Sequence, residues 1–136
     1  MEKYIKKGYA QPLPSSKLKR DNGLVWYMPH HSMHYPTKPK IRVVFNLKAR
    51  YKGTSLNDNL LQGPDMTNTL VGTLLRFKNG QHAVTADIEE MFHQVKVPVH
   101  DRDLLCFPWW PKGDTTQDWI EYKMGVHVFG AQSSPS

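Results

Sequence analysis

Short apolar stretches, each bounded by proline, glycine or polar residues, recur along the chain. Stretches of this length that are rich in β-branched and aromatic residues are typical of strands. The pattern predicts strands at residues 24–28, 41–45, 83–86, 104–107 and 119–122. The stretch at 83–86 is mostly apolar and ends in Asp87, as expected of a strand buried in the centre of a sheet.

One segment shows the spacing of a helix instead. Its apolar residues recur every three or four positions, at Met66, Leu70, Leu74 and Phe77. Pro64 and Asp65 precede it and Asn79-Gly80 follows it, which predicts one long helix between them. A short helix is expected over residues 2–8, ending at Gly8. The order β-β-α-β-β-β predicts an α+β fold with an antiparallel sheet, rather than a doubly wound one.

The segments between these elements are expected to be loops: residues 30–39, residues 48–59 and a Gly/Ser/Pro-bearing tail over 125–136. The first two strands could then form a hairpin around the first loop. That loop contains His30, His31 and His34, but structural zinc needs four regularly spaced ligands and no cysteine is nearby. Backbone or solvent contacts are therefore favoured for these histidines.

Charge is unevenly distributed along the 136 residues, a length that suits one domain or part of one. The first 52 residues carry twelve Lys and Arg against two acids, whereas the remainder carries six against ten. This split indicates a polyanion partner at one end and a cation site at the other, although solvated lysines would give the same pattern. A single cysteine, a charged N-terminus and the lack of a long apolar stretch favour the cytoplasm or nucleus and no membrane.

Asp87 is the sharpest candidate for chemistry. A carboxylate at the end of a buried strand is costly unless a cation or hydrogen bonds meet it, and Mg²⁺ prefers such oxygen ligands. Strands also end in Asp for turn reasons, so the residue alone leaves both interpretations open. Glu89 and Glu90 are interpreted as polar turn residues, and His93 as packed rather than catalytic. Stacking on bases is one role for Trp109 and Trp110, although tight turn packing beside their flanking prolines is favoured.

Several segments, in order, resemble reverse transcriptases. Residues 85–95 resemble the first palm motif, and are closest to the BEL/Pao group of long-terminal-repeat retrotransposons, whose typical form is Asp-Ile-Glu-Lys-Met-Phe. Residues 129–135 resemble the second palm motif. Further matches are residues 27–31, the fingers strand 40–45, the turn 55–58 with Gly63-Pro64, and the helix end 74–77. Asn46 and Glu90 depart from the family's usual Asp and Lys.

The resemblance implies roles for particular residues. Asp87 would be the catalytic metal-binding carboxylate, and the backbone carbonyl of Ile88 would help to hold the second of two Mg²⁺ ions. Phe92 would be a steric gate against the 2′-hydroxyl, and the competing interpretation is a core side chain. The remaining implied residues bind nucleotide (Lys40, Arg42, Phe129 and Gly130) or nucleic acid (Gln132, Ser134 and Pro135). For Arg42 the alternative is a solvated sheet edge, and for residues 129–135 it is an unstructured tail.

In these terms residues 1–62 would be fingers-like and residues 63–136 the start of a palm that lacks the Asp-Asp hairpin. One carboxylate cannot hold two Mg²⁺ for nucleotidyl transfer, so we expect no polymerase activity from this chain alone. In the intact protein the partners would be deoxynucleotides and an RNA or DNA template-primer; the oligomeric state is open. A non-enzymatic nucleic-acid-binding remnant, or a transposable-element relic without a selected role, are the alternatives.

Overall fold

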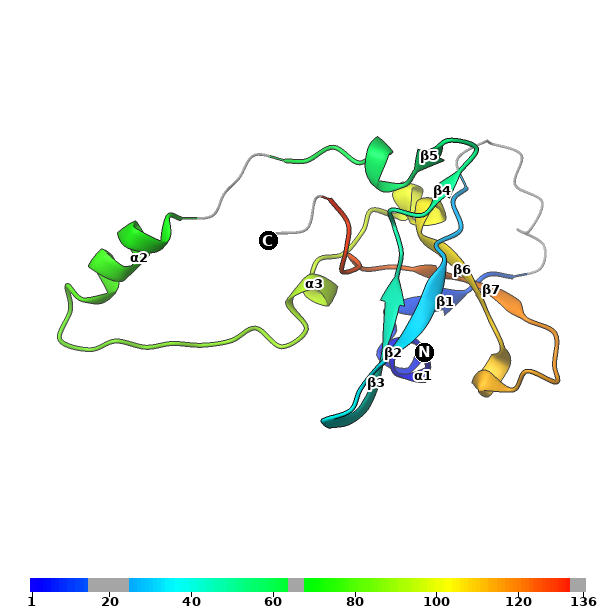
Figure 1. Cartoon of the computed structure of the whole chain (residues 1–136), viewed down its shortest axis with the longest axis horizontal. Coiled ribbons are helices and arrows are strands. Elements are labelled where there is room, and N and C mark those ends of the chain that lie inside the picture. Colours follow the sequence, from blue (N-terminus) through cyan, green and yellow to red (C-terminus); the bar gives the residue numbers. More distant parts are fainter. Residues whose placement is uncertain (15–24, 64–67, 133–136) are drawn as a thin grey trace.

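A computed structural model describes residues 1–14, 25–63 and 68–132, except for the side chains of residues 38–40. The fold mixes helices with antiparallel sheets, as the α+β prediction requires. The elements of Figure 1 are α1 (Glu2–Lys6), β1 (Ala10–Pro12), β2 (His30–Tyr35), β3 (Lys38–Phe45), β4 (Arg50–Tyr51), β5 (Thr54–Ser55), η2 (Asn57–Asn59), α2 (Leu70–Phe77), α3 (Met91–Gln94), η3 (Val99–Leu105), β6 (Cys106–Trp109), η4 (Pro111–Gly113) and β7 (Ile120–Met124).

A three-stranded antiparallel sheet in the order β1-β7-β6 forms the centre of the body. The expected strands at 104–107 and 119–122 are confirmed with shifted bounds, as β6 and β7. Beyond β7 the chain continues alongside residues 95–97, where the amide of His127 donates to the carbonyl of Val95 at 2.8 Å and that of Val97 donates to Gly125 at 3.0 Å. The expected C-terminal tail is therefore wrong for residues 125–132, because pairing and packing bury several of them.

The second sheet is the β2–β3 hairpin, in which His30 pairs with Phe45 and Met33 with Arg42. The expected strand at 41–45 is confirmed as part of β3. The expectation that it pairs with residues 24–28 is wrong, because its partner is the histidine segment, which is a strand rather than a loop. Residues 26–28 instead run beside residues 103–106, with the amide of Met28 donating to the carbonyl of Cys106 at 2.8 Å. A polar sequence can form a strand when a neighbour completes its hydrogen bonds, and that neighbour was invisible to local periodicity.

Aromatic and aliphatic side chains from both sheets meet in one core. Phe107 is fully buried, and its ring lies 5.3 Å from that of Phe45 and 5.8 Å from that of Tyr122. Met28, Leu47, Met124 and Val128 are the other large side chains that are almost completely buried. The core therefore joins β3, β6 and β7 to the segment that follows β7.

α1 ends as the sequence predicts. Gly8 has φ +73°, the amide of Gly8 donates to the carbonyl of Ile5, and that of Tyr9 donates to Tyr4. This pair of bonds is a Schellman motif, in which a left-handed residue satisfies the last carbonyls of a helix. The turn directs the chain into β1, so α1 is held against the body.

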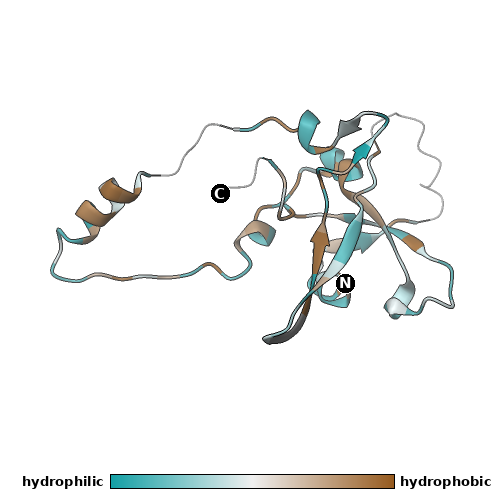
Figure 2. Cartoon of the chain, in the orientation of Figure 1, coloured by the Kyte–Doolittle hydropathy of each residue, from teal (hydrophilic) through white to brown (hydrophobic). Residues whose placement is uncertain are grey.

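Residues 68–89, which we call the arm, project from the body (Figure 1). Here the expectation of one long helix is wrong over the described residues: α2 has eight residues, and residues 64–67 lie outside the described part. Its apolar residues are exposed, Leu70 to 73%, and Figure 2 shows the helix mostly brown and away from the body. Residues 83–86 are exposed and form no strand, because no described segment pairs with them. In the part of the chain that the structure describes, no helix has both the length and the apolar character needed to cross a membrane.

Candidate functional site

Phe92, on the four-residue helix α3, contacts two residues that follow β7. Its ring lies 5.2 Å from that of Phe129, edge to face, and 6.2 Å from that of His127, nearly parallel. The pairing of residues 95–97 with 125–127 brings these side chains together, since it fixes the register between α3 and the end of the chain. Two residues that the resemblance assigned to one nucleotide pocket therefore touch.

The turn after Phe129 is anchored by Asn57, a buried side chain of η2. The amide nitrogen of Asn57 donates to the carbonyl of Gly130 at 3.0 Å, and its oxygen accepts from the backbone amide of Gln132 at 3.0 Å. Gly130 has φ +97°, a conformation that side chains other than glycine rarely adopt. A Cβ added to Gly130 would lie 3.7 Å from the carbonyl oxygen of Phe45, so this turn borders the end of β3.

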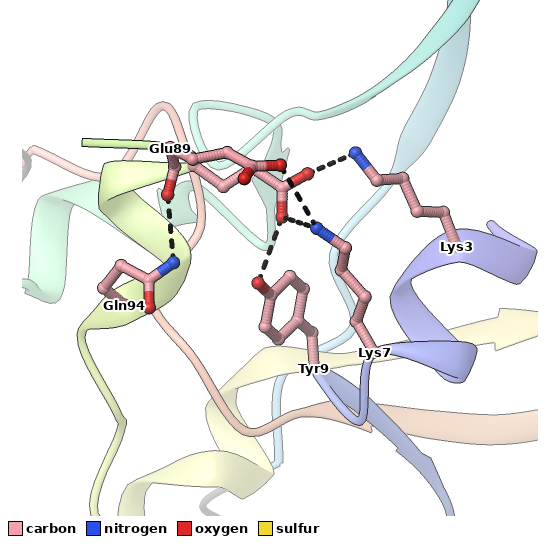
Figure 3. Close-up of polar contacts among 6 residues, drawn as sticks. Lys3, Lys7, Tyr9, Glu89 and Gln94 are labelled. Atoms are coloured by element: carbon pink, nitrogen blue, oxygen red, sulfur yellow. Dashed lines mark hydrogen bonds and ion pairs between the residues drawn. The ribbon is translucent and has the colours of Figure 1, made fainter. Parts of the chain in front are cut away.

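Glu90 links α1 to the start of α3. Lys3 donates to one carboxylate oxygen, while Lys7 at 2.8 Å and the hydroxyl of Tyr9 at 3.0 Å donate to the other (Figure 3). The hydrogen bonds from Lys3 and Lys7 lower the pKa of Glu90 to about 2, against a smaller opposing effect of burial. Glu90 is thus a polar turn residue, as expected, but its carboxylate is also tied to the N-terminal helix, whereas Glu89 has an 85% exposed side chain.

His93 is packed, as the sequence analysis favoured. Its ring stacks on Tyr9 at 5.0 Å and meets Tyr4 edge to face at 5.2 Å. Burial lowers the pKa of His93, and its buried Nδ1 has no hydrogen-bond partner among the described residues. A neutral, packed imidazole fits this position better than a proton-transfer group.

Asp87 and Ile88 lie exposed in the irregular end of the arm, rather than at the end of a buried strand. Glu90 is the nearest partly buried carboxylate in sequence, and ion pairs with two lysines already balance its negative charge. Within residues 1–14, 25–63 and 68–132, no three His, Cys, Asp or Glu side chains gather closely enough to hold a metal ion. The described residues therefore do not form a two-metal centre around Asp87.

The remaining predicted site residues lie in different parts of the structure. Arg42 is exposed on β3, with its guanidinium carbon 5.7 Å from the centre of the Tyr35 ring. Lys40 belongs to β3, but its side chain lies outside the described part, as do Ser134 and Pro135. Gln132 is exposed at the anchored turn. The structure thus brings together Phe92, Phe129, Gly130 and Gln132, and leaves Asp87 and Arg42 at the surface.

A second feature is an apolar hollow of about 470 Å³ lined by Tyr27, Pro108, Trp110 and Trp119. Tyr27 donates its hydroxyl to the buried carboxylate of Glu121 at 3.0 Å. The ring of Trp109 lies 5.8 Å from that of His30 and contacts that of Trp110 edge to face at 6.1 Å. Both tryptophans therefore contact neighbouring rings, and a role in stacking on bases stays a prediction.

No protein-family model, curated protein or solved structure matches this chain. Functional assignment depends on the motifs and on the geometry around Phe92. The sequence placed Asn57 in a turn without a role, and no local signal could have shown its partners, which lie more than seventy residues away. Nothing in the sequence pointed to the pairing of Glu90 with Lys3 and Lys7, which lie more than eighty residues away.

Proposed function

We propose that this chain is a reverse-transcriptase fragment, fingers and first part of the palm, and that it recognises a deoxynucleoside triphosphate beside Phe92. The observation that carries the proposal is the contact between Phe92 and Phe129 at 5.2 Å. These residues come from the two segments that resemble the first and second palm motifs. Two motifs that a nucleotide pocket needs side by side are thus neighbours, although 37 positions separate them in the chain.

The chemistry at this position suits a sugar. The half-buried Phe92 ring presents an apolar wall, and the 67% exposed Phe129 extends it. A ring fixed between His127 and Phe129 would leave no space for a 2′-hydroxyl and offer it no hydrogen bond. A buried hydroxyl without a partner is strongly disfavoured, so this wall would select deoxynucleotides.

The phosphates would extend towards the β2–β3 hairpin. Phe45 ends β3 next to Gly130, and Arg42 lies three residues earlier, roughly 10 Å along the strand. Its exposed guanidinium has the planar donor arrangement that binds phosphate oxygens in pairs. Mg²⁺ enters the proposal as the ion that accompanies the triphosphate, with Asp87 as a candidate ligand from the arm. The proposal concerns recognition, since the described residues form no two-metal centre.

The test is binding of Mg²⁺-dATP and Mg²⁺-ATP to the whole chain, measured by isothermal titration calorimetry. We expect tighter binding of dATP, and we expect Phe92→Ala to bring the two affinities close together. Met91→Ala is the matched control, because Met91 is the exposed neighbour on α3 and should leave the preference unchanged. Arg42→Gln should weaken the binding of both nucleotides equally. Failure of the unmodified chain to bind either nucleotide at millimolar concentration would exclude this function.

A second candidate is supported by the charge of the first 52 residues, twelve basic against two acidic. All the basic residues of this segment whose side chains are described are exposed: Lys3, Lys6, Lys7, Arg42, Lys48, Arg50 and Lys52. Such a chain could bind nucleic acid through phosphate contacts alone, as a non-enzymatic remnant. Binding of single-stranded DNA that weakens steeply with salt, needs no Mg²⁺ and is unchanged by Asp87→Asn and Phe92→Ala would favour this candidate over nucleotide recognition.

A further inference from the structure

Glu90 occupies a strained position two residues before Phe92, as the N-cap of α3. Its backbone has φ 52° and ψ 44°, in the left-handed region that a glutamate rarely adopts. Its carbonyl accepts a hydrogen bond from the amide of His93 at 2.8 Å, which closes the turn that becomes α3. The direction of the Phe92 side chain therefore depends on a turn that is unfavourable on local grounds.

Three donors from the first nine residues hold this turn. Lys3 and Lys7 come from α1 and its C-terminal end, and Tyr9 leads into β1 (Figure 3). The side chain of Glu90 is only 17% exposed, so its contacts are partly shielded from water and salt. Tyr9 also stacks on His93, so it contacts both the N-cap residue and the third residue of α3.

α1 is itself fixed to the body, so it can serve as a rigid support. Tyr4 and Ile5 pack against the core, and the amide of Gly125 donates to the carbonyl of Tyr9 at 2.7 Å. The position of Phe92 is thereby fixed relative to the sheet and to the segment after β7 that contains Phe129. Two residues after α3, Lys96 forms an isolated antiparallel β-bridge with Val126, which fixes the C-terminal end of the helix.

We propose that Glu90 is a positioning residue: through Lys3, Lys7 and Tyr9, the N-terminal helix holds the turn that aims Phe92 at Phe129. The selectivity of the pocket for deoxynucleotides would then depend on residues at the N-terminus that do not contact the nucleotide. This second part rests on the proposed function, whereas the first part concerns the structure without nucleotide.

The first experiment measures the Phe92–Phe129 contact directly, by ring-to-ring nuclear Overhauser effects in the chain without nucleotide. We expect the contact to be lost or weakened in Glu90→Gln and in the Lys3→Gln/Lys7→Gln double variant. Glu89→Gln is the matched control, because Glu89 is exposed and lies 3.7 Å from Lys7. Glu90→Gly separates the backbone from the side chain: glycine adopts the left-handed turn easily, so only the loss of the ion pairs remains.

A thermal melt of each variant shows whether the body remains folded, and the charge-swapped triple variant Lys3→Glu/Lys7→Glu/Glu90→Lys provides a rescue. We expect the rescue to restore the ring contact, which a non-specific loss of stability would not permit. If the contact persists unchanged in the folded Glu90→Gln and Glu90→Gly variants, the positioning role is refuted, whatever the chain binds.

The second experiment compares the affinities for Mg²⁺-dATP and Mg²⁺-ATP in the same variants. The preference for dATP should fall towards that of Phe92→Ala in Glu90→Gln, stay unchanged in Glu89→Gln and recover in the charge swap. If the unmodified chain binds no nucleotide, the proposed function fails, and the ring contact still decides whether Glu90 positions Phe92. A preference that stays intact in Glu90→Gln would overturn the link to selectivity.

Discussion

Asn57 offers the most direct test of how the candidate site is held together. Its side chain is 5% exposed and makes two hydrogen bonds of 3.0 Å, to the carbonyl of Gly130 and from the amide of Gln132. A hydrogen bond contributes about 0.5–1.5 kcal/mol net, and the released groups lie in an exposed turn where water can replace the lost partner. Asn57→Ala should therefore cost about 1–3 kcal/mol of unfolding free energy.

Urea denaturation followed by tryptophan fluorescence measures this cost. With a slope of about 2 kcal/mol per molar urea, the midpoint should fall by roughly 1 M. Hydrogen exchange locates the effect: the amide of Gln132 should lose protection, while that of Val97, bonded to Gly125, should keep it. Asn59→Ala is the matched control, because Asn59 is exposed and its side chain donates to Thr54 and Ser55 rather than to the turn at Gly130.

Asn57→Asp sharpens the test, because it keeps the acceptor and loses the donor. At pH 7 a carboxylate would face the carbonyl of Gly130, so this variant should be at least as unstable as Asn57→Ala. At acidic pH the protonated carboxyl can donate again, and the gap from the unmodified chain should narrow. An unchanged exchange rate at Gln132 in Asn57→Ala, or a midpoint shift smaller than about 0.3 M, would refute this account of the anchored turn.

Two further predictions concern His93 and the arm. Burial lowers the pKa of His93 from 6.5, so the unfolded chain binds more protons below that pH, and stability should fall as the pH drops below about 6.5. His93→Phe keeps a stacked ring and should flatten this part of the profile of unfolding free energy against pH; an equally steep profile would contradict the assignment. Leu74→Asp, on the exposed α2, should change the unfolding free energy by less than about 0.5 kcal/mol, whereas the core substitution Met124→Ala should cost about 2–5 kcal/mol. Comparable losses in the two variants would show that the arm packs on the body.

Arg42 and Phe92 show how far motifs can place a site. The sequence placed Arg42 in a strand, which β3 confirms, whereas it gave Phe92 a role but no helix. It could not show that Phe92 meets Phe129, because that contact depends on the register between two stretches that pair across the sheet. The strand expected before Asp87 does not form for a related reason. An apolar run forms a strand only when a neighbouring strand completes its backbone hydrogen bonds.

The sequence by itself determined the elements whose signals are local. Gly8 ends α1 because glycine alone adopts φ +73° without strain, and the β-branched run in β3 extends because such side chains favour a pleated surface. Only the tertiary structure decided that the histidine segment became β2, that α2 has no partner in the body, and that Glu90 accepts bonds from Lys3, Lys7 and Tyr9. Those outcomes depend on which distant segments lie beside one another, since burial and charge pairing act through space whereas periodicity records only neighbours along the chain.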